Sequence, residues 1–86
     1  MNDVTELADG WLIVSAPFAL EQVRVRDVPT GMPTLSIDAQ VTGSIPEVAV
    51  YADTDREVLT PNAARRFADA LRQAADAAER MSGGSR

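Results

Sequence analysis

The C-terminal third of the chain carries the most restrictive pattern in the sequence, a helical periodicity that starts at residue 60. Thr60 is a favoured N-cap residue and Pro61 a favoured first helical residue. At 100° per residue, the apolar residues from Ala63 to Met81 fall in an arc of about 180°, and polar residues fill the rest. A chain of 86 residues with one such helix must supply an apolar surface for it to cover.

The apolar arc of this helix is wider than one supporting sheet needs, which is about 100° or a little more. It divides into two seams, the first made of Ala64, Ala68, Leu71, Ala75 and Ala78, and the second made of Ala63, Phe67, Ala70, Ala74, Ala77 and Met81. We expect one seam to pack on the chain's own sheet and the other seam to meet a second helix or a partner. The alternative is that alanine, the best helix former, simply tolerates exposure.

Upstream of residue 60, prolines and glycines separate short segments that are rich in β-forming residues. We predict strands at residues 11–15, 21–28, 34–42 and 47–52, and residues 4–7 could add a short edge strand. Short connections make consecutive strands neighbours. The expected fold class is α+β, a three- or four-stranded antiparallel β-meander followed by one long C-terminal α-helix packed on one face. Residues 1–81 would form a single domain, and residues 82–86 (Ser-Gly-Gly-Ser-Arg) a flexible tail.

Three residue types with important chemistry are missing from the sequence, because it has no Cys, no His and no Lys. Without them the chain has no thiolate nucleophile, no cysteine-based metal site, no imidazole base and no Schiff-base lysine. We therefore expect a protein that is not an enzyme, with no catalytic residues, no cofactor and no metal.

The formal net charge of −5 is unfavourable for general nucleic-acid binding and for an anionic membrane surface. No apolar run approaches the roughly 20 residues of a transmembrane helix, and the acidic start lacks the basic region of a signal peptide. These features favour a cytoplasmic location, with no membrane and no nucleic acid among the partners.

Two sets of charged residues are candidate ligand sites. Asp53, Asp55 and Glu57 alternate and could offer oxygen ligands to Mg²⁺ or Ca²⁺, but Val58 stands where an EF-hand loop needs glycine, so a solvated turn is favoured. Five arginines could grip phosphate or a carboxylate: Arg24, Arg26, Arg65, Arg66 and Arg72. They lack interleaved aromatic residues and a recognised binding motif, which favours a solvated charged surface.

The predicted strand at residues 11–15 is apolar on both faces, with Trp11 and Ile13 on one side and Leu12 and Val14 on the other. A sheet covered by a single helix leaves one of these pairs exposed, and exposed apolar patches mark interfaces. The candidate interface comprises Trp11, Leu12, Ile13, Val14, Tyr51, Phe67, Ala70, Ala74, Ala77 and Met81. The alternative is that residues 1–9, or the segment at residues 17–18, fold over the open side.

Residues 59–79 (LTPNAARRFADALRQAADAAE) resemble the closing helix of small actinobacterial and actinobacteriophage proteins of unknown function. The resemblance covers about a quarter of the chain and carries no catalytic residues. It implies a few strands followed by a capped, alanine-rich helix, and an actinobacterial or phage source.

These observations predict a small non-catalytic protein–protein interaction module that self-associates as a homodimer, either an accessory protein or a phage-encoded protein that engages a host partner. The alternative is a nucleic-acid-related regulator, either an arginine-mediated binder or an acidic DNA mimic. A carboxylate enzyme that uses the acids at residues 53–57 is a third possibility.

Overall fold

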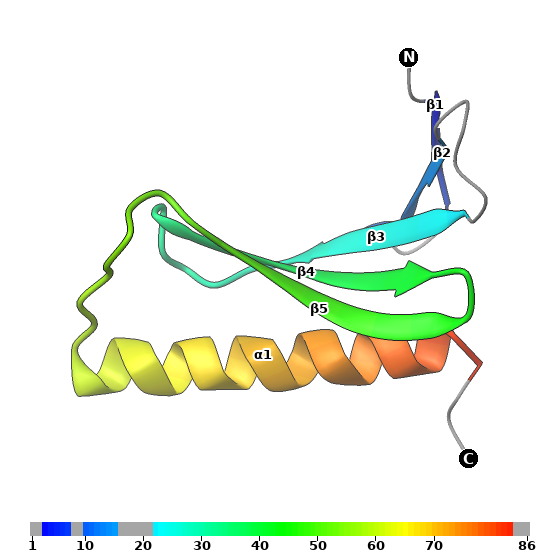
Figure 1. The fold of residues 1–86 in the computed structure, drawn as a ribbon. Helices are drawn as coiled ribbons and strands as arrows, with labels where there is room; N and C mark the ends of the chain where they lie inside the picture. Colours follow the sequence, from blue (N-terminus) through cyan, green and yellow to red (C-terminus); the bar gives the residue numbers. More distant parts are fainter. Residues whose placement is uncertain (1–2, 8–9, 16–21, 84–86) are drawn as a thin grey trace.

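The computed structural model describes residues 3–7, 10–15 and 22–83 as one antiparallel sheet with one helix packed on it (Figure 1). The elements follow chain order: β1 (Asp3–Glu6), β2 (Leu12–Ser15), β3 (Val23–Val28), β4 (Leu35–Thr42), β5 (Ile45–Ala52) and α1 (Pro61–Met81). This confirms the predicted α+β meander with a C-terminal helix on one face. The sheet has five strands rather than three or four, because the short edge strand near residues 4–7 is present as β1 and pairs with β2.

The helix begins and ends where its capping residues predict. Thr60 Oγ1 accepts a hydrogen bond from the N–H of Ala63 at 3.1 Å, and Pro61 is the first helical residue. At the other end the N–H of Ser82 donates to the carbonyl of Ala78 at 2.9 Å, and Gly83 adopts a positive φ of 78°. Glycine takes this left-handed conformation without steric cost, which closes the helix. Residues 84–86 of the predicted tail lie outside the described residues.

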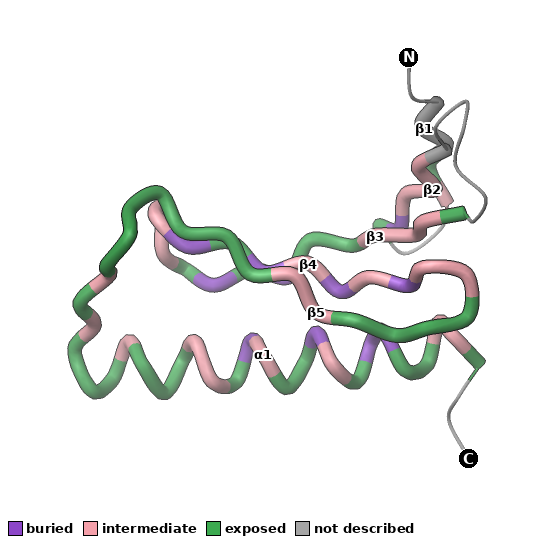
Figure 2. Tube along the Cα trace, in the orientation of Figure 1, coloured by how far each residue is buried: buried purple, intermediate pink, exposed green. Residues whose placement is uncertain are grey.

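The core lies between α1 and the middle of the sheet. α1 runs along one face of β4 and β5 and touches β3 only slightly, whereas the β1–β2 hairpin projects from the far edge (Figure 1). The side chains of β4 alternate as predicted, and Ile37, Ala39 and Val41 are completely buried. Figure 2 shows buried positions recurring along β4. Alanines on the facing side of α1 allow the helix to approach the strands closely.

The seam of α1 that faces the sheet is the one that the sequence analysis assigned to a partner. Ala70, Ala74 and Ala77 are buried, and Phe67 and Met81 pack against the same core while remaining partly exposed. Trp11 also belongs to this core, with 4% of its surface exposed.

The assignment of these residues to an outer surface is therefore corrected. Trp11, Ala70, Ala74 and Ala77 are enclosed by the chain's own core, so they offer no surface to a partner. In the first seam only Ala78 is buried, whereas Ala64 is exposed and Ala68, Leu71 and Ala75 are partly exposed.

Candidate interaction surface

α1 packs on one face of the sheet. We call the other face, which points away from α1, the open face. Directly opposite residues of paired strands share a face. Gln40 and Thr42 of β4 alternate with the buried residues and so lie on the open face. Their partners on β3 are Val25 and Val23, and these in turn pair with the residues of β2. The register therefore gathers four apolar side chains on the open face, which we call the open-face patch: Leu12, Val14, Val23 and Val25.

The open-face patch is a compact block of two residues on each of two strands. All four side chains are partly buried, because each lies beside the others. The row through Val14 and Val23 continues over Thr42 to Ile45, whose side chain is 58% exposed. Among the described residues, α1 does not reach this block, since it lies on the opposite face. The patch is therefore an apolar surface outside the main core.

The remaining candidate residues divide between the faces. Ile13 pairs with Arg24 and lies on the helix side of the sheet, as does the buried Trp11, which confirms the predicted alternation along this strand. Tyr51 pairs with Ser36 and lies on the open face with 55% of its surface exposed. Of the predicted interface, Leu12, Val14 and Tyr51 are thus on the open face, although Tyr51 is several residues from the open-face patch.

The sequence offers two segments that could cover the open face, residues 1–9 and residues 17–18. Residues 3–6 form β1 beside β2, so this part of the N-terminal segment extends the sheet instead of folding over it. The segment at residues 17–18 lies outside the described residues.

The pairing of β3 with β4 places the even-numbered residues of β3 on the helix side, and two of them are arginines. Arg24 pairs with Val41 and Arg26 with Ala39. The guanidinium of Arg24 donates from Nη1 to the carbonyl of Met81 at 3.4 Å and from Nη2 to the carbonyl of Gly43 at 3.2 Å. Arg24 therefore fixes the end of α1 to β3 and to the β4–β5 turn, and it is not free to bind a ligand.

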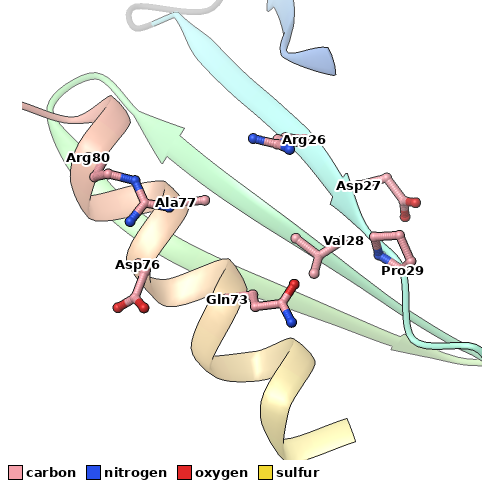
Figure 3. A pocket seen from close by; sticks show the side chains of 8 residues that line it. All are labelled: Arg26, Asp27, Val28, Pro29, Gln73, Asp76, Ala77 and Arg80. Atoms are coloured by element: carbon pink, nitrogen blue, oxygen red, sulfur yellow. The ribbon is translucent and has the colours of Figure 1, made fainter. Parts of the chain in front are cut away.

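Arg26 instead borders a pocket of about 180 Å³ between β3 and α1 (Figure 3). Arg26 and Arg80 extend toward each other across it, whereas the carboxylates of Asp27 and Asp76 point away. Neither guanidinium has an ion-pair partner in the part of the chain that the structure describes. Two guanidinium groups can hold a carboxylate or a phosphate. The pocket lining includes the carboxyl groups of Asp27 and Asp76, but no hydroxyl, thiol, imidazole or lysine side chain.

The acids at residues 53–57 lie in the loop between β5 and α1. Asp53 and Asp55 are exposed, Glu57 is partly buried, and Thr54 Oγ1 donates to the carbonyl of Arg56 at 2.8 Å. Within residues 3–7, 10–15 and 22–83, no three acidic side chains gather into a set that could hold a metal ion.

Two carboxyl groups on the open face were not predicted as a pair: Asp27 and Asp38 lie directly opposite each other on β3 and β4. Partial burial and then the charge of Asp27 raise the pKa of Asp38 above its usual value of 3.8. Each strand was predicted, but the pairing between them was not, and the sequence contains no local signal of that register.

Glu47 lies further along the same face. Its carboxylate accepts hydrogen bonds from Gln40 Nε2 and Thr42 Oγ1, both at 2.8 Å. The hydrogen bond from Thr42 and then that from Gln40 lower the pKa of Glu47. This carboxylate is therefore held over β4.

No protein-family model matches the chain, and comparison with curated proteins and with solved structures finds no significant match. Within the described ranges, no helix has the length and apolar character needed to cross a membrane.

Proposed function

We propose that this chain is a small non-catalytic protein–protein interaction module that self-associates. The observation that carries the proposal is the open-face patch, four neighbouring apolar side chains on the sheet face that α1 leaves uncovered. Contiguous apolar surface of this kind marks interaction sites in soluble proteins. The resemblance of the C-terminal helix supports an accessory or phage-encoded role.

The side-chain chemistry supports binding rather than catalysis. The sequence has no Cys, His or Lys, and the pocket between β3 and α1 has only arginines, acids and a glutamine as polar groups. Such a set can recognise a partner through hydrogen bonds and charge, but it provides no activated nucleophile.

Static light scattering across micromolar concentrations tests self-association. We expect a molar mass that rises above the 9.2 kDa of one chain as concentration increases. A mass that stays at 9.2 kDa throughout would contradict this part of the proposal.

A hydrophobic dye tests whether the open-face patch is accessible. The folded wild type should enhance the fluorescence of 8-anilinonaphthalene-1-sulfonate, and Val25→Ser should reduce the enhancement. The matched control is Ser36→Ala on the polar end of the same face, which should not reduce it. Equal signals from the wild type and Val25→Ser would remove the observation on which the proposal depends.

The second candidate is a nucleic-acid-related regulator, and it is favoured by Arg26 and Arg80, whose guanidinium groups have no ion-pair partner among the described residues. Retention on a heparin or DNA resin at low salt, lost in the double variant Arg26→Ala/Arg80→Ala, would support this function. The net charge of −5 opposes it, and we expect no retention.

A further inference from the structure

β5 forms one edge of the sheet, and none of the described residues pairs with its outer side (Figure 1). Natural edge strands avoid further pairing by being short or by carrying charges. β1, at the other edge, has four residues and two acids in its sequence, whereas β5 has eight residues and no charge after Glu47. Ile45, Val50 and Tyr51 on this strand are three of the four large hydrophobic residues exposed in the described chain.

The hydrogen-bonding register shows which backbone groups of β5 face outward. The N–H of Asp53 donates to the carbonyl of Thr34 at 3.0 Å, in line with the β4–β5 register. Hydrogen-bonded and non-hydrogen-bonded pairs alternate along antiparallel strands, so the alternate residues Val48, Val50 and Ala52 direct their N–H groups away from β4. Pro46 has the same orientation, so its missing N–H removes no bond to β4 but leaves the outer edge one donor fewer at this position.

We infer that a second copy of this chain pairs with β5, antiparallel and about a two-fold axis at Ala49, to form one continuous sheet. This inference rests on the proposed function, because it assigns the self-association to one strand. In this register Val48 lies opposite Val50 of the second copy, and Ala52 lies opposite Pro46. Each outward N–H group of either copy then meets an outward carbonyl of the other.

A neighbouring register that centres on Val50 also uses these N–H groups, but it sets Glu47 opposite Asp53 of the second copy. Like charges directly opposite each other destabilise a strand pair. With the axis at Ala49, Glu47 lies opposite Tyr51 instead. The charge pattern of β5 therefore favours the axis at Ala49 over the axis at Val50.

The surroundings of β5 leave room for a second strand. The carboxylate of Glu47, the one charged side chain of β5, is held over β4 by Gln40 and Thr42 and so is turned away from the outer edge. Below the strand, a groove of about 190 Å³ separates β5 from α1, and its helix side includes the short side chains of Ala75 and Ala78. The two-fold axis places both helices on one side of the joined sheet and leaves both open-face patches uncovered on the other.

A cysteine at position 49 tests the axis directly. The chain has no cysteine, so any disulfide in a single-cysteine variant joins two copies. In the inferred dimer, the two residues at position 49 form a non-hydrogen-bonded pair with Cα atoms about 4.5 Å apart, which suits a disulfide. We expect Ala49→Cys to cross-link rapidly under mild oxidation, and Val25→Cys and Thr54→Cys to cross-link slowly.

A charge at the edge tests the pairing without a covalent bond. Val50 is 51% exposed, so Val50→Lys should fold, as circular dichroism can verify. We expect it to weaken dimerisation about 10-fold or more, because it brings like charges together across the axis. The matched control is Val58→Lys, at a residue that is 71% exposed but outside β5, and it should leave dimerisation unchanged.

The outcomes separate this inference from the proposed function. If the wild type dimerises but Ala49→Cys stays reduced, the axis at Ala49 is overturned while self-association stands. If Val25→Cys cross-links faster than Ala49→Cys, the dimer forms through the open-face patch and the β5 pairing is overturned. A wild type that is monomeric at all concentrations overturns both.

Discussion

The two faces of the sheet differ in which strands contribute their apolar side chains, although side chains alternate along every strand. Along β4, the apolar side chains point toward α1 and the polar ones toward the open face. On β2 and β3 the apolar residues of the open-face patch point away from α1, and Arg24 and Arg26 take the helix side. The sheet therefore has an apolar region on each face, displaced sideways, and its one helix covers only the first. Among the described residues, α1 does not reach the second region, and this is the basis of the proposed binding function.

The largest expected difference between the faces is in their contribution to stability. Val41→Ala should lower the free energy of unfolding by about 2–3 kcal/mol, because Val41 is completely buried under α1. The same change at the partly exposed Val25 should cost about 1 kcal/mol or less. Urea denaturation measures both, and equal losses would show that the open-face patch is as well covered as the core.

A smaller difference in stability is expected between the two arginines on the helix side of β3, because only Arg24 is hydrogen-bonded to the end of α1. Arg24→Ala should lower the free energy of unfolding by about 1 kcal/mol, through loss of its bonds to Met81 and Gly43. Arg26→Ala removes the same side chain from the pocket rim and should change stability by less than about 0.5 kcal/mol. Similar effects at both positions would mean that Arg24 does not fix the helix end.

The smallest effect is expected at the acid pair on the open face. Because Asp38 has a raised pKa, the folded state binds its proton more tightly than the unfolded state does. The associated stability is present below the usual value of 3.8 and is lost as the pH rises through the folded-state pKa.

Asp38→Asn removes the repulsion from Asp27, so it should stabilise the protein at pH 7 by less than about 1 kcal/mol. Thermal unfolding at pH 7 and well below pH 3.8 measures this, and the gain should vanish at the acidic pH. Asp55→Asn in the exposed loop is the control and should have no effect at either pH. If Asp38→Asn were less stable than the wild type at pH 7, the repulsion between Asp27 and Asp38 would be refuted.

The features that were predictable from the sequence are local ones. The cap at Thr60, the proline at Pro61 and the segregated helical pattern place α1, because each acts within one or two turns. The alternation of β4 likewise predicts its buried face, since successive strand residues point to opposite sides. The absence of Cys, His and Lys likewise excludes thiolate, imidazole and Schiff-base lysine chemistry from the sequence alone.

The tertiary structure decided everything that depends on how distant segments meet. Two adjacent alanine-rich seams fit a helix equally well, and only packing against β4 selects the one with Ala70, Ala74 and Ala77. The register between β3 and β4 sets the open-face patch, turns Arg24 inward and brings Asp38 against Asp27. Within one strand, successive side chains point to opposite faces whatever the neighbouring strand is. Which set faces α1 is fixed by the turn to the neighbouring strand and by the side on which the helix packs.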